Sequence, residues 1–377
     1  RSLTPSRPAA RGPAPSRSDA ICRAVLSGGV FLPATSRFTP YHRSVRRRAP
    51  LVLCLCLAGI IPTLALAAPA RAEAIAARDT LAPPPGRDAK TAARIHGLVY
   101  PTGAFHVERD PAPHPYFDRL VRFPSPHPAG EPALDTVTME WRYARHGGEP
   151  IAGGAPAVVV IHSIQPGMLV GRTVAHQLAD RGRHAFVLQL PGYGSRLPDA
   201  ARWSPVRAME RGRQAVADAR RARDAVAALP GIADEGVTLV GISLGGYVAA
   251  TAAALEPAAW SEVYLVASGA DVMTVLTHGE RDAARMARRL ALAGYRTNTL
   301  RLLVDDVEPT PLLHRLDPQR THLIRPIHDR VVPPASYDAL IHAAELPASN
   351  VHRWEANHYT LMLHLPRLID LVAPRPD

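Results

Sequence analysis

Residues 237–254 constrain the fold of this chain more than any other stretch. An apolar, β-branched run leads directly into Gly-Ile-Ser-Leu-Gly at 241–245, and an alanine-rich run with helical character follows. A serine between two glycines at a strand-to-helix turn is the arrangement of a nucleophile elbow. The sharp turn strains the backbone of its central residue, and flanking glycines avoid the clash that side chains would cause. The stretch predicts that Ser243 carries a nucleophilic hydroxyl at the edge of a sheet.

A base and an acid follow Ser243 in the chain order Ser, Asp, His that this type of nucleophile requires. The segment 321–329 is predicted to be a strand that ends in Asp329, which places the carboxylate at the same sheet edge as the turn. A last strand is predicted over 351–356, with His358 in the loop behind it. The imidazole of His358 would take the serine proton, and the carboxylate would stabilise the imidazolium.

Several alternatives stay open at this point. A Gly-rich turn with an idle serine, and an aspartate that only forms a turn, explain the same residues without catalysis. Asp271 ends an earlier predicted strand and is the alternative acid. His328, His352 and His364 are rivals of His358 by residue type, but they fall beside the acid, inside the last strand and inside the last helix.

The oxyanion formed during nucleophilic attack needs two backbone N–H donors. Leu244, the residue after the nucleophile, is expected to supply the first at the start of a helix over 245–255. Ile164, in the loop after the apolar strand 157–162, is expected to supply the second. The same residues also fit a buried strand followed by an ordinary loop.

From about residue 120 to its C-terminus, the sequence resembles the α/β-hydrolase fold family of serine esterases and lipases. The resemblance rests on the elbow at 241–245, Asp-Arg-Val-Val-Pro at 329–333, Asn-His-Tyr at 357–359 and Leu-Pro-Gly-Tyr-Gly-Ser-Arg at 190–196. This sequence has His162-Ser163 where the family usually has His-Gly. Serine has less backbone freedom than glycine, so the departure bears on the oxyanion hole and on the choice of Ile164.

The resemblance implies an enzyme that cleaves carboxylic esters through an acyl-enzyme, with Ser243 as nucleophile, His358 as base and Asp329 as the partner of the base. It implies a small-molecule ester as substrate. The sequence has neither a zincin-type His-x-x-x-His pair with a Glu nor a phosphate loop with its Gly-Lys, so no cofactor is expected. A peptidase or acyltransferase with the same triad is an alternative within enzymes. A non-catalytic binding protein of the same fold is the alternative outside them.

The positive charge of the chain is confined to its beginning. The formal net charge is +11, and residues 1–72 hold 11 arginines and one acidic residue, a net charge of +10. The remainder holds 33 basic and 32 acidic residues and is close to neutral. The charge therefore gives no reason to expect a nucleic-acid partner.

Residues 46–72 have the organisation of a secretory signal. Three arginines precede the apolar run 51–68, and an A-x-A exit suited to cleavage lies at 65–67, at the end of the run, or at 70–72. We expect an exported protein without a stable membrane partner after cleavage. An uncleaved membrane anchor through the apolar run is the alternative.

The segment before this signal, residues 1–45, is rich in arginine, proline and serine and shows no strand or helix pattern. It is expected to be a disordered basic arm or a segment upstream of the true start, since the first methionine is Met139. All three cysteines, Cys22, Cys54 and Cys56, precede the expected cleavage. We therefore expect neither a disulfide nor a metal site in the mature part.

Strand and helix patterns alternate through the rest of the chain and predict a doubly wound, mostly parallel α/β sheet. A surface segment is expected at 73–118, and one domain over 119–377. Its strands are expected near 120–123, 136–143, 157–162, 184–190, 237–242 and 262–268, and its helices near 169–181, 206–228, 245–255 and 361–371. The charges of the helix at 206–228 are expected on a solvated face.

A helical insertion at about 272–316 is expected to form a small cap over the site. Its apolar side chains are expected either to line an acyl pocket or to pack the cap helices together, and the sequence favours neither. These residues are Met273, Val275, Leu276, Leu290 and Leu292.

Overall fold

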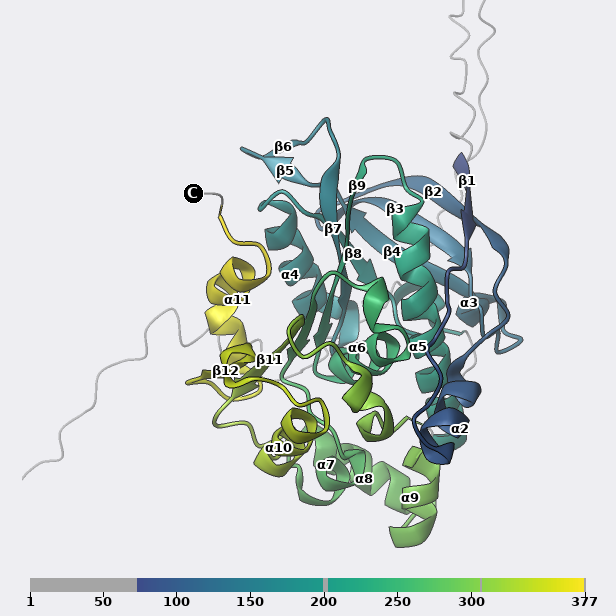
Figure 1. Cartoon of the computed structure of the whole chain (residues 1–377), viewed down its shortest axis with the longest axis vertical. Coiled ribbons are helices and arrows are strands. Elements are labelled where there is room, and N and C mark those ends of the chain that lie inside the picture. Colours follow the sequence, from purple (N-terminus) through teal and green to yellow (C-terminus); the bar gives the residue numbers. More distant parts are fainter. Residues whose placement is uncertain (1–72, 199–202, 306, 376–377) are drawn as a thin grey trace, which may run out of the picture. The chain divides into compact units, whose positions relative to one another are not determined.

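A ten-stranded sheet forms the centre of the computed structural model, which describes residues 73–198, 203–305 and 307–375 (Figure 1). The strands are β1 (Glu73–Arg78), β2 (Ala104–His114), β3 (Phe117–Pro124), β4 (Thr136–Arg142), β7 (Ala155–Ile161), β8 (His184–Leu188), β9 (Ile232–Ile242), β10 (Val263–Val266), β11 (Thr321–Pro326) and β12 (Val351–Trp354). Strands β5 (Arg145–His146) and β6 (Glu149–Pro150) form a separate hairpin.

The sheet has an antiparallel part and a parallel part. Its strand order is β1-β2-β3-β4-β8-β7-β9-β10-β11-β12. Neighbours from β1 to β8 pair antiparallel, and neighbours from β8 to β12 pair parallel. The predicted α/β fold with a mostly parallel sheet is therefore confirmed. The carboxyl ends of β9, β11 and β12 lie at the same edge, where side chains from distant parts of the sequence meet.

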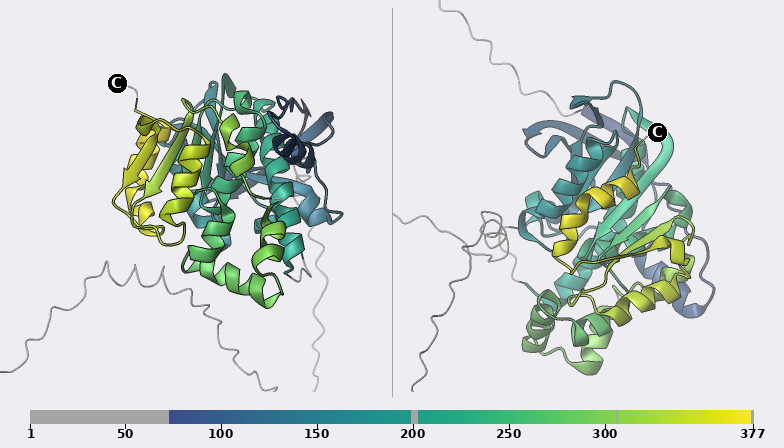
Figure 2. Two further views of the ribbon diagram at one scale, coloured as in Figure 1. Left: turned by 60° about the horizontal axis from the view of Figure 1, so that its bottom comes forward. Right: turned by 90° about the vertical axis from the view of Figure 1, so that its left-hand side faces the viewer.

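Helices cover both faces of the sheet (Figure 2). They are α2 (Ala89–Leu98), α3 (Pro132–Asp135), α4 (Leu169–Ala179), α5 (Pro205–Ala227), α6 (Leu244–Leu255), α7 (Val272–His278), α8 (Asp282–Leu292), α9 (Thr297–Asp305), α10 (Pro334–Ala343) and α11 (Leu365–Val372). Short 3₁₀ turns are η1 (Pro166–Met168), η2 (Gly194–Arg196), η3 (Pro257–Ala259), η4 (Thr310–Arg315), η5 (Ala348–Asn350) and η6 (Thr360–His364).

The alternation of side chains along β7 shows how the two layers are built. Val158 and Val160 pack with residues of α4 and α11 on one face. Val159 and Ile161 pack with residues of α5, α6 and α10 on the other. Successive side chains of a strand point to opposite faces, so a strand buried on both sides is apolar throughout.

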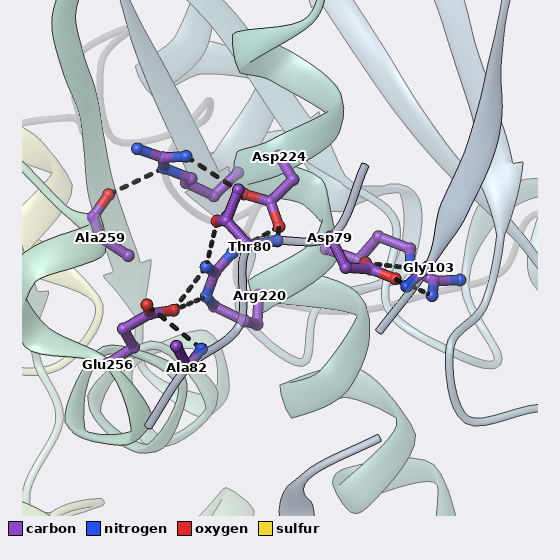
Figure 3. Close-up of polar contacts among 10 residues, drawn as sticks. Asp79, Thr80, Ala82, Gly103, Arg220, Asp224, Glu256 and Ala259 are labelled. Atoms are coloured by element: carbon purple, nitrogen blue, oxygen red, sulfur yellow. Dashed lines mark hydrogen bonds and ion pairs between the residues drawn. The ribbon is translucent and has the colours of Figure 1, made fainter. Parts of the chain in front are cut away.

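Residues 73–118 do more than wrap the surface. Strands β1 and β2 extend the sheet beyond β3, and the chain between them is tied to α5 (Figure 3). Asp79 accepts two hydrogen bonds from Arg221, at 2.8 and 2.6 Å. The backbone N–H and the hydroxyl of Thr80 donate to Asp224, at 2.8 and 2.7 Å. The proline and alanine content of this segment does not indicate strands. Strands β1 and β2 form because they pair with their neighbours in the sheet.

The prediction that the charges of α5 face solvent holds for Arg207 and Glu210 in its first turns but was wrong for the second half of the helix. Arg220 and Asp218 are fully buried, and Asp224 is 4% exposed. Arg220 pairs with Asp224 and with Glu256 (Figure 3). Asp218 pairs with Arg196 at 2.7 Å. The N-terminal segment covers this face of the helix, and each buried charge is matched by an opposite one, which a helical pattern does not reveal.

The segment predicted as a cap is helical. Helices α7, α8 and α9 lie together at the lower end of the molecule in Figure 1, beyond the strand ends. No helix within the described ranges is long and apolar enough to span a bilayer. The predicted signal at 46–72 and the arm at 1–45 lie outside the described residues.

Candidate active site

Ser243 occupies a sharp turn between β9 and α6. Its φ of 53° and ψ of −115° lie in a region that side chains rarely adopt. A Cβ atom at Gly241 would lie 2.5 Å from Cβ of Ala249, and one at Gly245 would collide with the carbonyl of Ile161. Only glycine fits at both positions, so the two glycines allow α6 to start directly against the sheet.

Three side chains from separate strand ends form a continuous hydrogen-bonded chain. Oγ of Ser243 lies 2.9 Å from Nε2 of His358. Nδ1 of His358 lies 2.7 Å from Oδ2 of Asp329. The side chains of His358 and Asp329 are 10% and 1% exposed. The structure thus brings together the serine, histidine and aspartate that the chain order selected, with the carboxylate withdrawn from water.

Backbone and side-chain donors hold the carboxylate of Asp329 in place, and the sequence alone did not identify Tyr337 as one of them. Strand β11 ends at Pro326, so the carboxylate stands in the following turn rather than on the strand itself. Its Oδ1 accepts the N–H groups of Val331 and Val332, at 2.8 and 3.0 Å. Its Oδ2 also accepts the hydroxyl of Tyr337 at 2.6 Å. Burial, with the nearby carboxylate, raises the pKa of Tyr337 well above its ordinary value, so the phenol stays a donor.

The alternative acid and the rival histidines are engaged elsewhere. Asp271 begins α7 and accepts hydrogen bonds from the N–H and the hydroxyl of Thr274. Side chains of His328 and His364 contact Glu355, at its carboxylate and its carbonyl respectively. His352 lies 3.5 Å from His322.

The two predicted oxyanion donors lie beside the nucleophile. Ile164 and Leu244 line the same cavity as Ser243. Ser163 is not among the non-glycine residues with positive φ in the described ranges, so serine in place of glycine adds no strain of that kind. The Ile164 carbonyl accepts the hydroxyl of Tyr193 at 3.2 Å, which ties this loop to the turn after β8.

His162 fixes the same loop from within the protein. The N–H of Leu190 donates to its Nε2 at 3.2 Å, so its Nδ1 carries the proton and donates to the Ser163 carbonyl at 2.7 Å. His162 is fully buried. Burial lowers its pKa from 6.5 to about 4. The imidazole of His162 is therefore neutral in the native protein at pH 7.

This depressed pKa predicts a loss of stability in acid. Below pH 6.5 the unfolded chain binds a proton at His162 that the native protein does not bind until about pH 4, so stability falls as the pH falls through that window. Between pH 7.5 and pH 5, His162 should contribute a loss of about 2 kcal/mol. Urea unfolding at both pH values measures it. A His162→Gln variant should lack this component, and an equal pH dependence in both proteins would refute the assignment.

An apolar cavity of about 250 Å³ opens beside Ser243. It lies between the elbow, helix α5 and the cap. Of the cap residues proposed for an acyl pocket, Val275, Leu276 and Leu290 line it. The other two do not: Met273 packs within the cap, and Leu292 is 89% exposed. Helical spacing alone does not distinguish these faces, because both carry leucine or methionine.

No family model and no curated protein sequence matches this chain. Acetyl xylan esterase 1 from Thermoanaerobacterium sp. JW/SL YS485 superposes with a TM-score of 0.55 and 15% identity, covering 78% of this chain and 96% of the esterase. Acetyl xylan esterase from Paenibacillus sp. R4 gives 0.54 and 16%, over 77% and 97%.

The chain has the α/β-hydrolase fold. A puromycin-hydrolyzing peptidase of Mycobacterium tuberculosis is also similar to this chain, with a TM-score of 0.50 and 16% identity over 72% of this chain and 44% of the peptidase. Esterases and peptidases thus share the fold, and at these identities the similarity extends no further than the fold. The described part of this chain contains no group of three or more potential ligands placed to hold a metal ion.

Proposed function

We propose that this α/β-hydrolase is a serine hydrolase that cleaves carboxylic esters. The proposal rests on the hydrogen-bonded chain from Ser243 through His358 to Asp329 at the mouth of an apolar cavity. We also propose that the protein is exported, on the basis of the signal-like segment 46–72 alone.

The geometry supports a two-step reaction. Oγ of Ser243 attacks the ester carbonyl carbon while Nε2 of His358 takes the hydroxyl proton. The carbonyl oxygen becomes negative and is stabilised by the N–H groups of Leu244 and Ile164. The carbon–oxygen bond to the alcohol then breaks, and the imidazolium gives its proton to the departing oxygen. Water, activated by the same imidazole, attacks the acyl-enzyme and releases the acid.

The lining of the cavity favours an acyl chain longer than acetyl. Its volume of about 250 Å³ and its apolar walls leave room for more than the two carbons of an acetyl group. The names of the two acetyl xylan esterases indicate that they act on an acetyl ester, and this chain shares their fold. We propose an ester substrate here as well, with a larger apolar acyl group.

Covalent labelling tests the nucleophile without knowledge of the substrate. A fluorophosphonate probe should label the protein once, at Ser243, because an activated serine attacks phosphorus as it attacks an ester carbonyl. Mass spectrometry of the digested protein locates the label, and Ser243→Ala should take up none. A folded wild-type protein that stays unlabelled would instead favour a non-catalytic binding role. Peptidase activity would appear as hydrolysis of a p-nitroanilide at a rate comparable to the ester.

The chain-length preference tests the cavity. We expect p-nitrophenyl esters of four to eight carbons to give higher kcat/KM than acetate or palmitate. Met286 lines the cavity from α8, and Met286→Trp should shift the preference towards acetate by about tenfold or more. Leu292→Trp on the same helix is the matched control, because that side chain is 89% exposed. An unchanged profile in Met286→Trp would place the acyl chain elsewhere.

A further inference from the structure

A second cavity, of about 230 Å³, borders His358. It is lined by Arg281, His328, Arg330, Val331, Asn357, His358 and Tyr359. Val331 lines this cavity and the apolar one, so the two lie next to each other. Their chemistry differs, because the cavity beside Ser243 is walled mostly by apolar side chains, whereas the cavity beside His358 carries two guanidinium groups and two imidazoles.

One of the two guanidinium groups is not neutralised by a carboxylate. Arg330 pairs with Glu280 at 2.5 Å, and His328 with Glu355 at 3.0 Å. The guanidinium of Arg281 lies 5.5 Å from the ring centre of Tyr359. None of the ion pairs within the described ranges involves Arg281. The cavity beside His358 therefore carries a positive charge that an anion can balance.

Apart from the contact with Tyr359, the local structure gives no reason for an arginine at this position. Arg281 has φ 52° and ψ −108°, close to the backbone of Ser243, and arginine is strained there. It also stands immediately before α8, where a cation opposes the helix dipole and where its side chain caps no N–H. A residue that is disfavoured in both respects at the edge of a site points to a role in binding.

The chemistry of His358 decides which half of an ester lies in this cavity. Because the imidazolium protonates the departing oxygen, the alcohol part must lie against His358, and the acyl part then occupies the apolar cavity. We propose that the second cavity binds the alcohol part of the ester and that Arg281 recognises a carboxylate on it. The substrate class is then an apolar acyl ester of a small hydroxy acid. This inference rests on the proposed ester hydrolysis.

Two esters that differ in charge and little in shape test the role of Arg281. The anionic probe is 4-(hexanoyloxy)benzoate and the neutral one is 4-(hexanoyloxy)benzamide, each enzymatic kcat/KM being divided by the rate of base hydrolysis. We expect the wild type to favour the anion by about tenfold or more, as for a hydrogen bond to a charged group. Arg281→Gln should remove the preference, and Arg281→Lys should keep part of it.

Two further variants control for folding and for overall charge. Arg281→Gly should also lose the preference, and it guards against misfolding because glycine adopts φ 52° without strain. Arg288→Gln removes the same charge from an exposed position on the same helix and should leave the ratio unchanged.

The outcomes separate this inference from the proposed function. Hydrolysis that depends on Ser243 but shows no preference for the anion, or a preference that survives in Arg281→Gln, overturns the inference and leaves the esterase proposal standing. Absence of both hydrolysis and fluorophosphonate labelling overturns the esterase proposal. In that case calorimetric titration with 4-hydroxybenzoate decides: binding that Arg281→Gln abolishes supports the anion site, and no binding refutes it.

Discussion

Replacing Ser243 by alanine is expected to lower kcat for p-nitrophenyl butyrate by about 10⁴- to 10⁶-fold while the protein remains folded. The variant removes the only atom that can form the acyl-enzyme in the proposed mechanism, and alanine preserves the packing of the elbow. His358→Ala should cost about as much, and the double variant should cost no more than either, because the two side chains act as a unit. Steady-state kinetics with circular dichroism as a folding check measures this.

Two aspartate variants identify the acid. Asp329→Asn should lower kcat by about 10⁴-fold, since the amide neither stabilises an imidazolium nor favours the required tautomer. Asp271→Asn should stay within a few fold of the wild type, because Asp271 bonds to Thr274 at the start of α7. The reverse ranking, or activity that survives in Ser243→Ala, would reject the assigned triad.

The second large effect is expected on stability, at Arg196. Its fully buried guanidinium pairs with Asp218 and donates to the carbonyls of Gln189 and Leu134. Arg196→Met leaves the Asp218 carboxylate buried without its counter-charge, and should lower the free energy of unfolding by about 3–5 kcal/mol. Urea denaturation provides the measurement.

A double-mutant cycle separates the lost pair from lost packing. Asp218→Leu combined with Arg196→Met removes both charges, and should recover much of the stability that Arg196→Met alone loses. Arg320→Met, which breaks a half-exposed pair with Asp317, should cost about 1 kcal/mol or less. If the double variant is no more stable than Arg196→Met, the loss comes from packing and not from the uncompensated charge.

The sequence predicts those parts of the site that depend on local signals. The two glycines of the turn indicated that Ser243 is the nucleophile. The predicted ends of parallel strands placed Asp329 and His358 at the same edge of the sheet. Tyr337 and Arg281 had no such signal. Tyr337 reaches the aspartate from α10, and Arg281 is marked by its backbone conformation, which an arginine in the sequence does not reveal.

The fold was predictable where elements alternate regularly, from β4 to α6, and less so where distant segments cover each other. The burial of the charges on α5 depends on Asp79 and Thr80, which precede their partners by more than 140 residues. Helical periodicity describes one helix at a time and does not show that a distant segment of the chain packs over its charged face. The same limit applies to the cap, where Leu290 faces the cavity and Leu292 faces solvent.

The hydrogen bonds between Asp79 and Thr80 and helix α5 can form only late in the synthesis of the chain. Asp79 and Thr80 are made early, but Arg221 and Asp224 must be made before either can form its contacts. Before α5 is made, β1 and β2 lack these contacts, and we expect the sheet edge that they form to be open to pairing with other chains. Contacts between residues so far apart in sequence also slow folding. We therefore expect β1 and β2 to be among the last strands of the described sheet to become protected from hydrogen exchange as the protein folds.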